Sequence, residues 1–125
     1  MNLYKFSLKF RIGSFKFAFN GFRALLKNEH NSRIHSLAAF IAIIMGVILK
    51  ISPVEWSMLM IVIGIVFLTE LLNSSLEKLA DVIDPEWNER IRRAKDYAAA
   101  AVLISAIISV AVGGFIFIPK ILALI

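Results

Sequence analysis

The distribution of hydrophobic and polar residues divides the chain into a mixed N-terminal arm followed by three apolar segments. These segments are about Ile34–Leu49, Trp56–Leu72 and Tyr97–Pro119. A membrane-spanning helix needs about 20 predominantly apolar residues to cross a hydrocarbon core of about 30 Å. The first segment is shorter than that, so we expect neighbouring residues to extend it. The pattern predicts an all-α membrane protein with spanning helices over 32–50, 53–83 and 86–119.

Turn signals separate the predicted helices. Ser52, Pro53 and Glu55 have the order of an N-cap, a first-turn proline and a capping-box glutamate. Asp84-Pro85 repeats the cap-and-proline pattern, which predicts the start of the last helix at residue 86. Small residues recur along this helix, from Ala98–Ala101 onward, and favour close packing against a neighbouring helix.

The N-terminal arm, residues 1–30, combines positive charge with aromatic residues. It has no acid before Glu29, and six basic residues alternate with six phenylalanines. On one helix five of the basic residues would share a face and leave a broad apolar face; they are Lys5, Lys9, Lys16, Arg23 and Lys27. This pattern is typical of an amphipathic helix that lies on an anionic membrane surface. A solvated basic face packed on the rest of the protein is compatible with it too.

Composition supports the membrane class and sets the orientation. The 125 residues are 59% hydrophobic with a mean hydropathy of +0.80, too apolar for a soluble chain that forms one domain over 1–125. There is no cysteine, which excludes disulfides and thiolate metal sites. Lys and Arg number seven in residues 1–33, one near residue 50, five in 73–97 and one beyond. The positive-inside rule therefore places the arm and 73–97 in the cytoplasm and the C-terminus outside.

A stripe of acidic and amide residues forms the end of the second apolar segment. Glu70, Asn73, Glu77 and Asp81 recur on one helix face. Carboxylates on one face repel one another unless a cation lies between them, so the stripe indicates a metal-dependent site. A solvated helix end is the alternative reading, strongest for Asp81. Glu29 could complete an oxygen-rich Mg²⁺ site with Glu77.

Other polar residues near the same membrane face have two readings each. Lys95 is either an interface anchor or, beside an acidic metal stripe, a phosphate-binding lysine. Trp87 is either an interface anchor or an aromatic residue that stacks on a base, and His35 is more often a packing histidine than a catalyst. The sequence lacks the phosphate-loop, protein-kinase, GxSxG and HExxH motifs. Any use of ATP would therefore lie outside the common nucleotide folds.

Two motifs resemble one known family. They are Glu70-Leu-Leu-Asn73-Ser-Ser-Leu-Glu77-Lys-Leu-Ala-Asp81 and Arg93-Ala-Lys95-Asp96. With Asn28-Glu29 and Arg33-Ile34-His35, they make nearly the whole chain similar to the small prokaryotic membrane diacylglycerol kinase/undecaprenol kinase family. The resemblance implies a homotrimer in the bacterial cytoplasmic (inner) membrane, with sites shared between protomers. It also implies transfer of the γ-phosphate of MgATP to a lipid hydroxyl at the cytoplasmic face.

The resemblance also implies roles for individual residues. Glu70 would be the general base, Asn73 would position the reacting groups, and Glu29 and Glu77 would bind Mg²⁺. The nucleotide would be bound by Lys95 and Asp96 at its phosphates and by Glu89 and Trp87 near its adenine. Trp87 stands where the best-known diacylglycerol kinase has tyrosine.

Two further questions stay open in the sequence. Arg33-Ile34-His35 resembles the undecaprenol kinases, so we expect undecaprenol as the lipid alcohol, with diacylglycerol as the alternative. A non-enzymatic transporter or assembly subunit would place acids deep within the spans, but here they gather at one surface. A nucleic-acid-binding protein would leave the acidic stripe without a role, so we expect no nucleic-acid partner.

Overall fold

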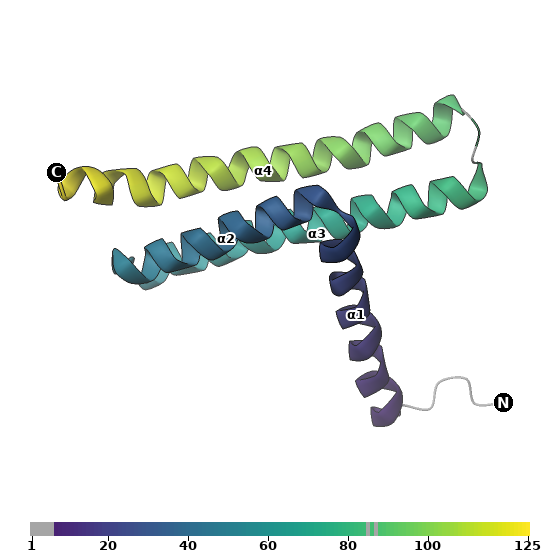
Figure 1. The fold of residues 1–125 in the computed structure, drawn as a ribbon, viewed down its shortest axis with the longest axis horizontal. Helices are drawn as coiled ribbons and strands as arrows, with labels where there is room; N and C mark the ends of the chain where they lie inside the picture. Colours follow the sequence, from purple (N-terminus) through teal and green to yellow (C-terminus); the bar gives the residue numbers. More distant parts are fainter. Residues whose placement is uncertain (1–6, 85, 87) are drawn as a thin grey trace.

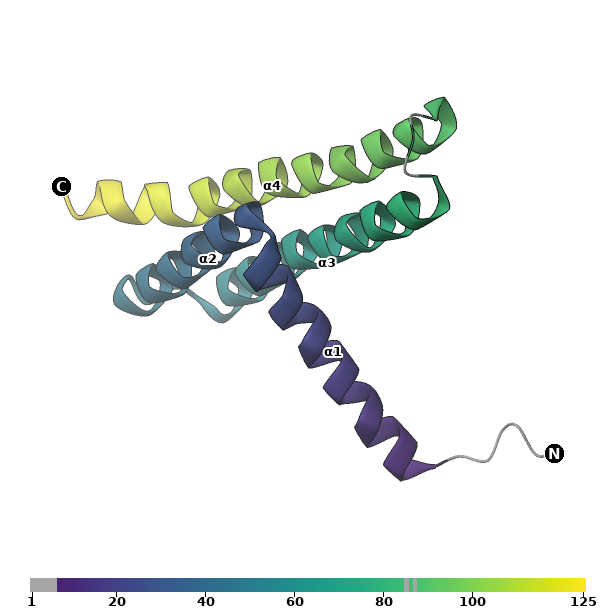
Figure 2. The ribbon, with the colours of Figure 1, turned by 45° about the vertical axis from the view of Figure 1, so that its right-hand side comes forward.

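Four helices form the structure, a computed structural model that describes residues 7–84, 86 and 88–125. They are α1 (Leu8–Asn28), α2 (His30–Ile48), α3 (Pro53–Ile83) and α4 (Glu89–Ala123). Helices α2, α3 and α4 lie side by side, and α1 projects away from this bundle at the start of α2 (Figures 1 and 2). The prediction of an all-α chain with one N-terminal helix and three further helices is confirmed.

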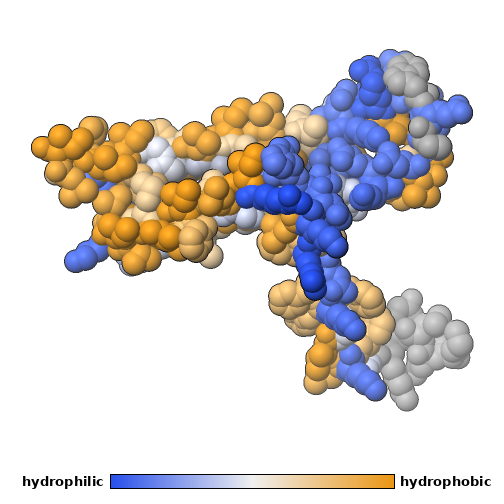
Figure 3. All heavy atoms as spheres, viewed as in Figure 1, coloured by the Kyte–Doolittle hydropathy of each residue, from blue (hydrophilic) through white to orange (hydrophobic). Residues whose placement is uncertain are grey.

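Helices α2, α3 and α4 are each long and apolar enough to cross a membrane. Only 11%, 22% and 17% of their most apolar windows is buried within the chain, so most of this apolar surface faces outward. Hydrophobic residues cover much of the bundle, whereas hydrophilic residues gather where α3 joins α4 and where α1 meets α2 (Figure 3). Exposed apolar surface on this scale is stable in a hydrocarbon environment and not in water.

The start of α3 has the capping arrangement that the sequence predicts. The Ser52 hydroxyl accepts a hydrogen bond from the Glu55 backbone N–H at 3.1 Å, and the Glu55 carboxylate accepts one from the Ser52 N–H at 3.0 Å. Pro53 follows as the first helical residue, where its missing N–H leaves no bond unmade. The α2–α3 hairpin is therefore fixed by local sequence.

The prediction for the start of α4 is wrong by three residues. Asn88 is the N-cap, since its Oδ1 accepts hydrogen bonds from the backbone N–H groups of Arg90 and Ile91. Asp84 instead ends α3, and its carboxylate accepts hydrogen bonds from the Glu86 backbone and the Asn88 side chain at 3.1 and 3.2 Å. Pro85, the second residue of the predicted cap-and-proline pattern, lies outside the described residues. At its other end α4 continues through Pro119 to Ala123.

Helix α1 ends where the chain turns into the bundle. Glu29 is at once the C-cap of α1 and the N-cap of α2. The Arg33 guanidinium donates to the backbone carbonyls of Leu26, at 2.8 Å, and Lys27. These bonds satisfy backbone carbonyls in the last turn of α1, which have no hydrogen-bond partner within the helix. The bend that brings α1 across α3 is therefore held by a side chain of α2.

Two sets of contacts hold the bundle together. Ile51, Leu59, Ile116 and Phe117 form a buried cluster near the α2–α3 turn. Nearer the α3–α4 junction, the hydroxyls of Thr69 and Ser105 lie 2.9 Å apart. Ser105 is buried, as expected for a small residue at a helix contact, but Ala99, Ala100 and Ala101 are exposed.

Candidate active site

Glu70 is a carboxylate buried between α2 and α3, and only 4% of the residue is exposed. Its Oε2 accepts a hydrogen bond from the Ser32 hydroxyl at 2.5 Å. Ser32 is itself only 1% exposed. A buried acid is costly unless polar partners surround it, so this close polar contact marks a site that the fold maintains against its own stability.

The second carboxylate oxygen of Glu70 faces a histidine. His35 Nδ1 lies 2.6 Å from Glu70 Oε1. Neither atom has a hydrogen-bond partner among the described residues. The contact is therefore a close approach of the imidazole ring to the carboxylate without a hydrogen bond. One turn of α2 thus supplies polar partners to both oxygens of Glu70.

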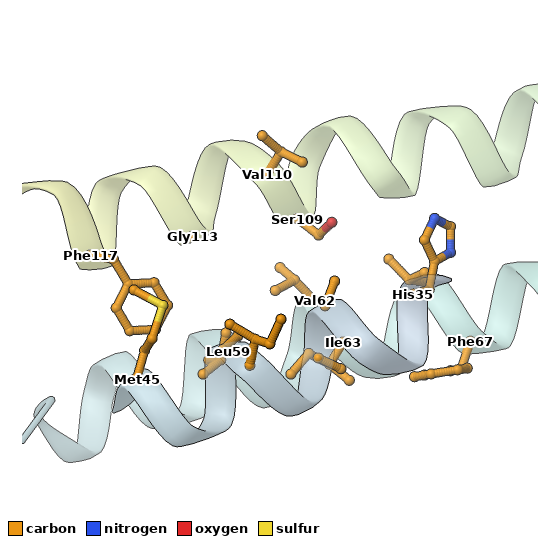
Figure 4. A pocket seen from close by; sticks show the side chains of 15 residues that line it. His35, Met45, Leu59, Val62, Ile63, Phe67, Ser109, Val110, Gly113 and Phe117 are labelled. Atoms are coloured by element: carbon orange, nitrogen blue, oxygen red, sulfur yellow. The ribbon is translucent and has the colours of Figure 1, made fainter. Parts of the chain in front are cut away.

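An apolar groove starts at this polar pair. It encloses about 380 Å³ between α2, α3 and α4. His35 lies at one end, Met45 and Phe117 lie at the other, and Leu59 and Val62 line the wall between them (Figure 4). On α2 the groove extends from His35 to Met45, which corresponds to about 15 Å along the helix. The shape suits one hydrocarbon chain with a polar group at the histidine end.

The remaining members of the acidic stripe diverge from Glu70. Asn73 lines a separate cavity of about 390 Å³ between α3 and α4, where its Oδ1 is buried without a hydrogen-bond partner. Glu77 is half-buried one turn further along. The sequence places these residues on one face of a helix, but the helices packed on that face give each a different surrounding.

Glu29 lies over α3 where α1 ends. It lines a cavity of about 330 Å³ with Ser74 and Lys78, which flank the position of Glu77 on α3. Among the described residues, no three His, Asp or Glu side chains come close enough together to hold a metal ion by themselves. Glu29 therefore lies near the turn of α3 that carries Glu77, although Glu77 is not among the residues that line this cavity.

Lys95 points from α4 to the end of the stripe. Its Nζ lies 3.0 Å from Asp81 Oδ1 on α3. The structure thereby gives Asp81 a partner that the sequence did not assign to it. Lys95 and the carboxylates of α3 lie at the same end of the bundle, as a phosphate-binding lysine beside a metal site requires.

The other predicted nucleotide-binding residues lie on the outer face of α4. Asp96 is 3.9 Å from Arg92, and Glu89 is 3.6 Å from Arg93, each pair one turn apart and exposed. Glu89 and Arg93 also line a concave surface with Tyr97. The predicted adenine contact Trp87 lies outside the described residues.

The sequence pattern did not single out Ser32 and favoured a packing role for His35, and in the structure both side chains contact Glu70. Both lie within the first turns of α2, three residues apart and so on the same side of the helix. The α2–α3 hairpin offered a signal, since residues at similar distances from the turn lie at similar depths. His35 on α2 and Glu70 on α3 lie at roughly similar distances along the chain from this turn, which is consistent with their close contact.

Comparison with known proteins agrees with this arrangement. Residues 16–117 match the family described as prokaryotic diacylglycerol kinase. The chain is 36% identical over 107 residues to undecaprenol kinase of Bacillus subtilis, with 86% of this chain and 87% of that protein covered. It is 33% identical over 94 residues to diacylglycerol kinase of Escherichia coli strain K12, covering 75% and 77%. A diacylglycerol kinase of Synechocystis is 33% identical over 112 residues, covering 89% of this chain and 64% of that protein.

The fold and site define a multi-pass α-helical membrane protein with a buried carboxylate near one end of its bundle. The chain belongs to the prokaryotic diacylglycerol kinase family and is a lipid kinase, a phosphotransferase that uses ATP. The resemblance read from the two sequence motifs is confirmed.

Proposed function

We propose that this protein is an undecaprenol kinase, which transfers the γ-phosphate of ATP to the hydroxyl of a long polyprenyl alcohol. The observation that carries the proposal is the apolar groove that ends at the His35–Glu70 pair. A lipid whose hydrocarbon chain follows the groove presents its hydroxyl beside His35, whose ring contacts Glu70, the only carboxylate buried among the described residues. The similarity to the B. subtilis undecaprenol kinase favours a polyprenyl alcohol over diacylglycerol.

Phosphoryl transfer depends on positioning and on charge neutralisation more than on covalent chemistry. In this proposal Glu70 supplies the basic group that removes the proton of the acceptor hydroxyl. Its burial excludes water from that group. Lys95 provides positive charge for the nucleotide phosphates, and Asp96 and Glu89 contact the nucleotide from α4. Asn73, whose buried Oδ1 lacks a hydrogen-bond partner, positions the reacting groups.

The carboxylates fit a role in binding Mg²⁺. This ion commonly binds one or two protein carboxylates and completes its coordination with water and substrate phosphates. Glu29 lines a cavity against α3 together with Lys78, the residue next to Glu77, and that cavity has room for such ligands. When bound, Mg²⁺ would neutralise phosphate charge. These two residues would hold it beside the basic end of α4.

The site is proposed to lie at the cytoplasmic face and to be completed in a homotrimer. Most Lys and Arg residues lie in α1 and around the α3–α4 junction, which supports the cytoplasmic orientation. The small buried fraction of each candidate span leaves outward apolar faces that other protomers could cover. The outer face of α4, with Glu89 and Asp96, would then meet a neighbouring protomer's acidic stripe.

A direct test uses purified protein in mixed micelles with labelled ATP and Mg²⁺. Undecaprenol and diacylglycerol are supplied separately at equal mole fraction, and the labelled lipid product is quantified. We expect kcat/KM for undecaprenol to exceed that for diacylglycerol by about 10-fold or more. The reverse preference would establish diacylglycerol as the substrate, and ATP-independent ion flux without lipid phosphorylation would contradict kinase activity.

A further inference from the structure

The apolar groove between α2, α3 and α4 is closed at the end opposite His35. Met45 from α2 and Phe117 from α4 lie at this end, and Leu59 from α3 lies beside them (Figure 4). Leu59 and Phe117 are only 3% and 7% exposed and belong to one buried cluster, against which Met45 packs. We call these three residues the groove floor. A hydrocarbon chain that starts at His35 therefore meets the groove floor after about 15 Å.

An ion pair lies one helical turn beyond the groove floor. Lys120 Nζ on α4 is 3.1 Å from Glu55 Oε1 on α3. Glu55 precedes Leu59 by four residues and Lys120 follows Phe117 by three. Each charged residue therefore shares a helix face with one residue of the groove floor. The two side chains are only 30% and 25% exposed, so the pair joins α3 to α4 at the level where the groove closes.

The two helices that this ion pair joins differ in how well they are fixed. Pro119 lies inside α4, immediately before Lys120. Proline has no backbone N–H, so α4 lacks one helical hydrogen bond at this point. Glu55 is held independently, because its carboxylate also accepts a hydrogen bond from the Ser52 N–H at the start of α3. Through Lys120, a fixed carboxylate on α3 thus holds the less well bonded end of α4.

We propose that Lys120 is a positioning residue for recognition of the lipid alcohol. Through its ion pair with Glu55 it keeps Phe117 against Leu59, so a hydrocarbon chain that fills the groove ends against a fixed floor. The inference rests on the proposed lipid kinase function and deepens it, because it names the part of the substrate that is recognised. That part is the stretch of one hydrocarbon chain within about 15 Å of the hydroxyl. Any further chain lies outside the groove.

Alcohols of graded length separate this role from a general effect on stability. Geraniol is too short to reach the groove floor, farnesol is about as long as the groove, and undecaprenol is longer. Lys120→Met keeps the apolar stem without the charge, and Glu55→Gln keeps the oxygen that caps α3. In both variants we expect KM for farnesol and undecaprenol to rise about 4-fold, the effect of exposing one buried CH₂ group. Their kcat should stay within about 2-fold, because such contacts bind substrate and transition state equally.

Geraniol and two control variants complete the test. KM and kcat for geraniol should stay within about 2-fold of wild type in Lys120→Met, which also shows that the variant is folded. Lys120→Arg keeps the charge and should retain the wild-type KM for farnesol, as should Lys50→Met, which removes an exposed lysine from the α2–α3 turn. An unchanged KM for farnesol in Lys120→Met, or an equal rise for geraniol and farnesol, would overturn the inference and leave the kinase function intact. A wild-type protein that phosphorylates none of these alcohols would instead refute the proposed function itself.

Discussion

Lys95 on α4 and Asp81 on α3 form an ion pair of 3.0 Å between helices joined by the charged turn. The pair directs the lysine towards the acidic stripe. Its side chains are 37% and 68% exposed, so its contribution to stability is small, below about 1 kcal/mol. We therefore expect the pair to position the Lys95 ammonium group for ATP binding.

Replacement of Asp81 tests that role. Asp81→Asn removes the charge but leaves an oxygen that accepts a hydrogen bond, so Lys95 loses most of its orienting force. We expect KM for ATP to rise about 3- to 10-fold with kcat within 2-fold and unchanged thermal stability. The comparison is with Lys95→Met, which should raise KM for ATP further and lower kcat. An unchanged KM in Asp81→Asn would assign Asp81 to the solvated helix end.

Ser32 tests the polar surroundings of Glu70. Ser32→Ala removes the hydrogen bond that Glu70 Oε2 accepts and leaves a buried carboxylate with one polar neighbour fewer, at a cost of about 1–3 kcal/mol. We expect kcat for lipid phosphorylation to fall about 10-fold, and Ser32→Thr, which keeps the hydroxyl, to recover part of it. Ser36→Ala is the matched control on α2, because the Ser36 hydroxyl only bonds the backbone of Ser32. Equal kcat in Ser32→Ala and wild type would exclude this contribution.

The packing of Gly46 against Trp56 can be tested through stability. A Cβ at residue 46 would lie 2.8 Å from Cη2 of the Trp56 ring, closer than carbon atoms approach. We expect Gly46→Ala to lower stability by about 1–3 kcal/mol, measured as a reduced Tm in detergent. Gly64→Ala is the control, because nothing lies within 4 Å of its added Cβ. A Tm for Gly46→Ala equal to that of Gly64→Ala would show that the tryptophan moves freely.

The Thr69–Ser105 contact should affect helix association and leave catalysis unchanged. Its two hydroxyls lie 2.9 Å apart between α3 and α4. A double-mutant cycle with Thr69→Val and Ser105→Ala should give a coupling of about 0.6 kcal/mol, the average for such bonds in membrane proteins. Reversible unfolding in mixed micelles measures it. A coupling near zero would mean that packing of small residues alone holds these helices together.

Much of this fold follows from local sequence. The capping box at Ser52 fixed the start of α3, and the apolar segments fixed the number of spans. The predicted start of α4 was too early because Asp84 and Asn88 are both suitable N-cap residues. Which of the two caps α4 depends on how the chain folds between them, where their side chains form a hydrogen bond, and local sequence does not show this. Helix periodicity placed Glu70 and Asn73 on one face. It could not show that one faces α2 and the other α4, because that depends on helix packing.

The measurement that tests the central claim most directly is single-turnover transfer of labelled phosphate to undecaprenol by wild type and Glu70→Gln. Glutamine keeps the size of the buried side chain and removes its negative charge. The account predicts that transfer slows by at least about 100-fold in Glu70→Gln while ATP binding is retained. Transfer by Glu70→Gln at a rate close to that of wild type would contradict the assignment of Glu70 to proton removal.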